Sequence, residues 1–115
     1  MQRDDQATLL DIRQACERTI AGLGSLDLPG FMSDWRTQSV VLHQLMLLGE
    51  AVKRLTPEFR ERHSKIAWRE WAGLRDILIH AYDTVDNEMV WTIASTEVRP
   101  LLDQILLIQR TEAEQ

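Results

Sequence analysis

The stretch RDILIHAY, residues 75–82, carries the densest set of reactive side chains in the chain and lies within an apolar helical pattern. An α-helix turns by about 100° per residue, so Asp76 and His80 share one face and can hydrogen-bond. A carboxylate that holds one ring nitrogen of a histidine leaves the other nitrogen free to take or give a proton. The pair is therefore predicted to serve in general acid–base catalysis.

Arg75 and His80 raise a geometric difficulty, because five steps along one helix turn them apart by about 140°. Arg75 and Tyr82, seven apart, return to within about 20° of one another. Three solutions are open: the long stem of Arg75 reaches round, the helix breaks near His80, or a second copy of the helix completes the site. A structural interpretation also stays open, in which Arg75, Asp76 and His80 form a salt-bridge cluster on a partly buried face.

The helix that carries this stretch is predicted to span residues 67–81. Its apolar strip consists of Trp68, Trp71, Leu74 and Leu78. We expect the two tryptophans to pack in the core rather than to stack on RNA bases. Gly73 costs about 1 kcal/mol relative to alanine inside a helix, so we expect another segment to approach closely there.

Apolar residues at steps of three and four predict an amphipathic helix over residues 4–23, with Cys16 as a buried, inert thiol. Residues 22–30 are rich in glycine and proline, and we expect a plain connector there rather than a helix or a mobile lid. A second long helix should begin at Ser33 or Asp34 and run to Leu55.

Thr56 and Pro57 are predicted to open a short helix that runs to about Arg62, with threonine as its cap. After a break at residues 83–87, Thr84 or Asp86 can cap the last helix. That helix should reach about residue 110 and be kinked or restarted at Pro100, because proline removes one backbone hydrogen bond.

The chain has 115 residues, of which 44% are hydrophobic and 27% charged, which is typical of one globular domain. We expect a single domain over residues 1–115 with its core at about 4–110. Broad apolar faces on the predicted helices favour an all-α fold, an antiparallel four-helix bundle with a short extra helix and a kinked last helix. Surplus apolar surface favours a homodimer.

A formal net charge of −5 argues against indiscriminate nucleic-acid binding, so contact with RNA should be local. Arg60, Arg62, His63 and Lys65 form a basic cluster, which is either a solvated linker or an electrostatic guide for RNA or an acidic partner. The single cysteine cannot form an internal disulfide. No leader and no membrane span are evident, and we expect a cytoplasmic protein.

His43 and Glu50 lie seven apart on one predicted helical face. A solvated or dimer-facing pair is favoured over a metal site, because no third ligand stands at a suitable spacing. No metal ion or other cofactor is predicted.

RDILIHAY also fits the pattern Arg, four residues, His, one residue, Tyr, and here it resembles the HEPN domains. More narrowly it resembles the HepT-like ribonuclease toxins, which pair with a minimal nucleotidyltransferase antitoxin. LGEAVKRL at 48–55 is similar to that family's second-helix signature, and WREWAGL at 68–74 to the lead-in to the motif. Residues 90–91 and 100–101 resemble the last helix. The resemblance covers about residues 7–110 and departs at Ala67, where many relatives have proline.

The resemblance implies a HEPN-like dimer in which the motif helices of two copies face each other across a cleft. We hypothesise a metal-independent endoribonuclease toxin of a type VII-like toxin–antitoxin system, which leaves a 2′,3′-cyclic phosphate. Arg75 and His80 would be catalytic, Asp76 would orient His80, and Glu50 would have a supporting role. A nucleotidyltransferase antitoxin would neutralise the toxin by AMPylation of Tyr82, although Tyr82 packing at the helix end stays open. The alternative function is a non-catalytic helical subunit that binds a nucleotidyltransferase and positions its substrate.

Overall fold

The computed structural model describes residues 3–80 and 84–114 of the chain. Within these ranges lie helices α1 (Arg3–Leu23), α2 (Leu28–Met32), α3 (Trp35–Lys53), α4 (Pro57–Arg62), α5 (Trp68–Ala72), α6 (Leu74–Leu78), α7 (Asn87–Thr96) and α8 (Val98–Ala113), with strands β1 (Ile79–His80) and β2 (Thr84–Val85).

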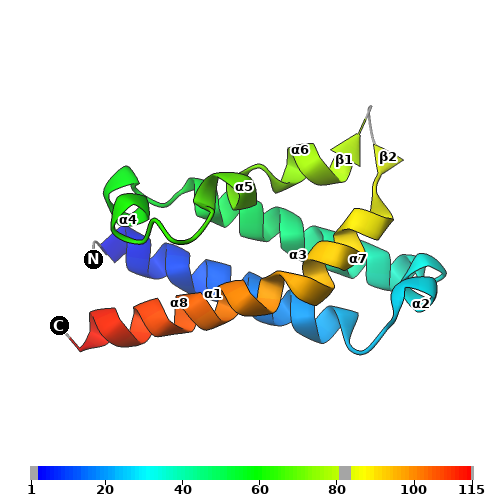
Figure 1. Ribbon diagram of the computed structural model, residues 1–115, viewed down its shortest axis with the longest axis horizontal. Helices are drawn as coiled ribbons and strands as arrows, with labels where there is room; N and C mark the ends of the chain where they lie inside the picture. Colours follow the sequence, from blue (N-terminus) through cyan, green and yellow to red (C-terminus); the bar gives the residue numbers. More distant parts are fainter. Residues whose placement is uncertain (1–2, 81–83, 115) are drawn as a thin grey trace.

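Four helical rods run antiparallel to their chain neighbours: α1, α3, the pair α5–α6 and the pair α7–α8 (Figure 1). Both ends of the chain lie at one end of the molecule, and the β1–β2 hairpin lies towards the other (Figure 1). The extents are 47 × 29 × 20 Å. The predicted all-α fold and antiparallel bundle are confirmed. Within the described ranges, no helix is long and apolar enough to cross a membrane.

The core is one continuous apolar cluster to which every long helix contributes. Its largest fully buried side chains include Phe31, Phe59, Leu9, Ile12, Leu45, Leu48, Leu78, Leu101 and Ile105. Cys16 is buried in this cluster, as predicted. Burial, with a smaller contribution from the charge of Glu17, raises the pKa of the Cys16 thiol to about 12, which keeps it protonated and unreactive.

Aspartate and threonine side chains fix where α3, α4 and α7 begin. Of the two candidates at α3, Asp34 is the cap and accepts a hydrogen bond from the Thr37 amide at 3.1 Å. Thr56 caps α4, as predicted, through the Phe59 amide at 3.2 Å. Asp86 caps α7. Each cap satisfies a backbone donor that the first turn of a helix leaves without an intrahelical partner.

The connector between α1 and α3 contains the one-turn helix α2, so the expectation that no helix forms there was wrong. Asp27 caps the turn through the Gly30 amide at 2.9 Å, and Pro29 stands in its first turn, where a missing N–H costs nothing. The side chain of Phe31 is fully buried and anchors the turn to the core. This anchoring favours a fixed connector over a lid.

The helix predicted over residues 67–81 is divided into α5 and α6 at Gly73 and ends early, at Leu78. The close approach expected at Gly73 occurs instead at Gly49 on α3. A Cβ atom at Gly49 would lie 3.1 Å from the carbonyl oxygen of Trp71 and 3.5 Å from the Cβ of Leu74. Gly49 therefore lets the α5–α6 junction pack directly on the α3 backbone.

The last helical rod restarts between Thr96 and Val98, which confirms the break expected from Pro100. A proline ring inside a helix clashes with the carbonyl four residues earlier, and here that residue is Thr96, the last residue of α7. The break places Pro100 in the first turn of α8, where its lack of an N–H is harmless.

Candidate active site

The described part of the motif stretch lies on α6 and on the strand that follows it. Leu74 and Leu78 are buried and fix α6 against the bundle, whereas Arg75, Asp76 and Ile77 on the same short helix are exposed. The guanidinium of Arg75 thus projects from a segment whose opposite face is held in the core.

His80 lies beyond the end of α6, on β1. Ile79 adopts an extended backbone, with φ −113° and ψ 118°, and pairs with Val85, while His80 pairs with Thr84. Ile79 and Val85 are β-branched residues that pack against the core, which favours the strand conformation. The break near His80 was one of the three geometric solutions left open by the sequence, and the 140° relation of a continuous helix therefore does not apply to Arg75 and His80.

The contact predicted between Asp76 and His80 depended on a continuous helix and is absent from the described contacts. Because α6 ends at Leu78, the two residues are no longer related by one helical turn. The carboxylate beside the imidazole is that of Asp86, whose Oδ2 lies 3.6 Å from Nε2 of His80. The sequence predicted only that Asp86 could cap a helix.

The side chain of His80 is 54% exposed and that of Asp86 is 36% exposed. In the described part of the chain, the side chains of Arg75 and Asp76 make no hydrogen bond or ion pair. The salt-bridge cluster considered as a structural explanation for Arg75, Asp76 and His80 is therefore not formed here. Exposed cationic and imidazole groups on a fixed segment are available to a ligand.

Tyr82, the predicted site of AMPylation, lies outside the described residues. In the sequence it stands two residues after His80.

Glu50, predicted to support the site, is exposed on α3 and forms a surface ion pair with Lys53 at 3.2 Å. His43 is exposed on the same side of this helix, seven residues earlier. Among residues 3–80 and 84–114, no group of three or more His, Cys, Asp or Glu side chains is placed to hold a metal ion.

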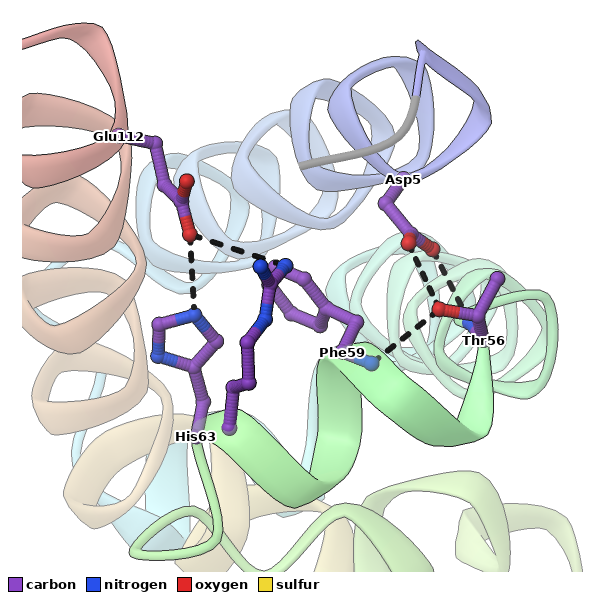
Figure 2. Close-up of polar contacts among 6 residues, drawn as sticks. Asp5, Thr56, Phe59, His63 and Glu112 are labelled. Atoms are coloured by element: carbon purple, nitrogen blue, oxygen red, sulfur yellow. Dashed lines mark hydrogen bonds and ion pairs between the residues drawn. The ribbon is translucent and has the colours of Figure 1, made fainter. Parts of the chain in front are cut away.

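The basic cluster after α4 is partly structural. Arg60 donates a hydrogen bond to the Val52 carbonyl at 2.8 Å, and His63 lies 3.3 Å from Oε1 of Glu112 on α8 (Figure 2). Lys65 remains exposed, beside an open groove that it lines together with Arg60 and Arg69 on α5. The interpretation as a purely solvated linker therefore does not hold for Arg60 and His63.

Comparison with known proteins adds an independent line of evidence. A family model described as "HepT-like: Ribonuclease HepT-like" matches residues 12–108. "Putative RNase TTE0752" of Caldanaerobacter subterraneus subsp. tengcongensis is 38% identical over 101 residues, which cover 88% of this chain and 90% of that protein. "Probable ribonuclease HepT" of Thermococcus cleftensis is 35% identical over 101 residues, or 88% of this chain and 92% of that protein.

No solved structure matches the chain. The family match covers most of the sequence, including the segment that carries Arg75 and His80. The chain belongs to the HepT-like ribonuclease family.

Proposed function

We propose that this protein is a metal-independent endoribonuclease toxin that cleaves RNA in the cytoplasm with Arg75 and His80. The observation that carries the proposal is the exposure of both side chains on one short segment, α6–β1, whose other face is buried through Leu74 and Leu78. Membership of a ribonuclease family supports RNA as the substrate.

The proposed reaction is a transesterification within the RNA strand. His80 takes the proton of a 2′-hydroxyl, and the 2′-oxygen attacks the adjacent phosphorus. Arg75 stabilises the negative charge that develops on the phosphorane oxygens. The bond to the 5′-oxygen then breaks, and this oxygen takes a proton from the imidazolium of a second His80. The products are a 2′,3′-cyclic phosphate and a 5′-hydroxyl, and DNA is not cleaved because it lacks the attacking group.

A second His80 requires a homodimer, and the surface of α3 supports one. Val40 and Leu47 are 49% and 43% exposed and stand seven residues apart, with His43 and Glu50 exposed on the same stripe. Residues seven apart share a face of a helix. Two-fold pairing through this stripe would cover the apolar side chains and would give Glu50 its supporting role at the interface.

Subunit mixing tests whether the active site is shared. Arg75→Ala and His80→Ala proteins are each expected to be inactive. A mixed dimer contains one intact Arg75 and one intact His80, from different copies. If the two copies form one cleft, it should recover part of the activity, with water in place of the second imidazolium as the proton donor to the 5′-oxygen. Sedimentation of each protein shows whether dimers form. A dimer without recovered cleavage would mean that each copy uses its own pair.

We further propose that the protein belongs to a type VII-like toxin–antitoxin system, in which a minimal nucleotidyltransferase transfers AMP to Tyr82. Tyr82 follows His80 by two residues, so the added phosphate would bring negative charge to the neighbourhood of Arg75 and exclude RNA. Co-expression with the nucleotidyltransferase should add the mass of AMP to the wild type but not to Tyr82→Phe. Tyr82→Phe should keep its ribonuclease activity under co-expression.

The experiment that tests the main proposal is cleavage of a labelled RNA by wild type, Arg75→Ala and His80→Ala in EDTA, with analysis of the 3′ ends. The wild type alone should produce cyclic-phosphate ends, and a DNA of the same sequence should stay intact. Equal, weak cleavage by all three proteins would indicate a contaminating nuclease. The alternative, a non-catalytic subunit that binds a nucleotidyltransferase, would then be favoured.

A further inference from the structure

We propose that Asp86 is the positioning residue of the active site: it holds Nε2–H of His80, so that Nδ1 is the nitrogen that exchanges a proton with RNA. This inference rests on the proposed ribonuclease function. It replaces Asp76, the residue expected from the sequence, with a carboxylate from the far side of the hairpin.

The side chains of Asp86 and His80 lie close together. Oδ2 of Asp86 lies 3.6 Å from Nε2 of His80, which is an ion-pair distance and slightly too long for a hydrogen bond. Catalytic hydrogen bonds are often long before substrate binds and shorten in the reacting complex. When Nδ1 takes a proton from the 2′-hydroxyl, the ring becomes a cation, and its attraction to the Asp86 carboxylate increases.

The Asp86 carboxylate is held in place by its other oxygen. Oδ1 accepts a hydrogen bond from the Met89 amide at 3.0 Å, which is the cap of α7. The helix cap thus fixes the carboxylate through one oxygen and leaves the other directed at His80. A side chain held in this way loses little conformational entropy when it orients its neighbour.

Main-chain hydrogen bonds also connect the segments that carry the two residues. The Asp86 amide donates to the Leu78 carbonyl at 2.8 Å, next to the ladder in which His80 pairs with Thr84. Leu78 is fully buried. The distance between His80 and Asp86 is therefore set by main-chain hydrogen bonds anchored in the core.

The corner that carries Asp86 is also fixed to the neighbouring helix. Asn87 donates to Oε1 of Gln38 on α3 at 3.3 Å, and Gln38 donates to the Phe31 carbonyl at 2.9 Å. Phe31 is fully buried. Asp86 thus stands on a braced part of the bundle, as the orienting carboxylate of a catalytic imidazole requires.

Two variants separate the cap from the contact with His80. Asp86→Ser keeps an oxygen that can cap α7 but removes the carboxylate next to the ring. Asp86→Asn keeps the shape and a capping oxygen, but its amide group can donate to Nε2 and so stabilise the opposite tautomer. Asp34→Ser is the matched control, because Asp34 caps α3 through the Thr37 amide in the same way and forms no described ion pair with a histidine.

We expect Asp86→Ser and Asp86→Asn to lower kcat for RNA cleavage by about 10- to 1,000-fold, part of the full effect of general base catalysis, with little change in KM. Asp34→Ser should cleave like the wild type. Nitrogen-15 NMR of the His80 ring should show a proton on Nε2 in the wild type and a shift of tautomer in Asp86→Asn. Asp76→Asn should leave this tautomer unchanged.

The His80→Ala variant distinguishes the two ways in which the proposal can fail. If His80→Ala is inactive while both Asp86 variants cleave at the wild-type rate, the ribonuclease stands and the role of Asp86 is overturned. If His80→Ala cleaves as fast as the wild type, the proposed function itself is overturned, and the role of Asp86 with it. Should Asp86→Ser fail to fold, Asp86→Asn, which keeps the capping oxygen, decides the question.

Discussion

Two histidines of this protein, His63 and His80, each stand beside a carboxylate, and their surroundings differ. His63 lies 3.3 Å from Glu112, with side chains 21% and 9% exposed. His80 lies 3.6 Å from Asp86, with side chains 54% and 36% exposed. The first pair is partly buried and joins the end of α4 to α8 (Figure 2), whereas the second faces solvent at the hairpin.

The residues around His63 are packed and hydrogen-bonded. The ring of His63 packs on Phe59, with ring centroids 4.6 Å apart, and Phe59 is fully buried. Near it, the buried carboxylate of Asp5 accepts hydrogen bonds from the Thr56 amide at 3.0 Å and the Thr56 hydroxyl at 2.7 Å (Figure 2). Polar groups that are paired and buried stabilise a fold, while similar groups left exposed on a fixed segment are available for chemistry.

The largest effect is expected at Arg75. Removal of its guanidinium by Arg75→Ala should lower the rate of RNA cleavage by about 100- to 1,000-fold, because charge on the phosphorane is no longer stabilised. The melting temperature should hardly change, since Arg75 is exposed. Arg69→Ala, which removes an exposed arginine on α5, is the control and should keep more than half of the wild-type rate. Similar losses in both variants would point to general electrostatic attraction of RNA instead.

Near His63, Asp5→Ala should lower the free energy of unfolding by about 2 kcal/mol, because it leaves the Thr56 amide and hydroxyl without their acceptor. Asp5 is only 1% exposed, so water cannot easily replace the carboxylate. Urea titration measures the loss. Asp4→Ala, the exposed neighbour on α1, should change stability by less than about 0.5 kcal/mol. Equal effects of the two variants would contradict the structural role of Asp5.

A smaller effect is expected when the His63 pair is weakened. Glu112→Gln removes the charge opposite His63 and Arg62 and should cost about 1 kcal/mol of stability, with the cleavage rate per folded molecule unchanged. Glu114→Gln, exposed two residues later on the chain, should be neutral. A fall in cleavage without a fall in stability would remove the distinction between the two histidine pairs.

The smallest effect concerns Cys16, a buried titratable group that belongs to neither pair. Its pKa rises from 9.0 to about 12 in the fold, so its contribution to stability is complete below pH 9 and is lost as pH rises towards 12. At about pH 9.5 the loss should be below about 1 kcal/mol. Comparison of the urea midpoints of wild type and Cys16→Ala between pH 8 and pH 10 measures the contribution of Cys16 ionisation to stability. A pH dependence identical in the two proteins would show that Cys16 ionises freely in the fold.

Periodicity predicted the bundle, because helix positions depend on local patterns, whereas the catalytic roles of Arg75 and His80 came from the family resemblance and stay predictions. Two contacts were beyond local reasoning. Asp5 and Thr56 stand 51 residues apart, and His63 and Glu112 stand 49 apart, so only the packing of distant helices brings them together.

Asp86 was missed for a different reason. Helical spacing pointed to Asp76, but the β-branched Ile79 and Val85 on either side of a short connection favour a hairpin over a longer helix. A hairpin signal of this kind, placed just before an aspartate that caps the next helix, is the feature that could have identified Asp86 in advance.

The most direct test of this account compares His80→Ala with His63→Ala in one assay of RNA cleavage and thermal unfolding. We predict that His80→Ala loses at least about 100-fold in cleavage rate and keeps its stability. His63→Ala should lose stability and keep the wild-type rate per folded molecule. The reverse result, with cleavage dependent on His63 and indifferent to His80, would contradict the assignment of the exposed pair to catalysis and the partly buried pair to the fold.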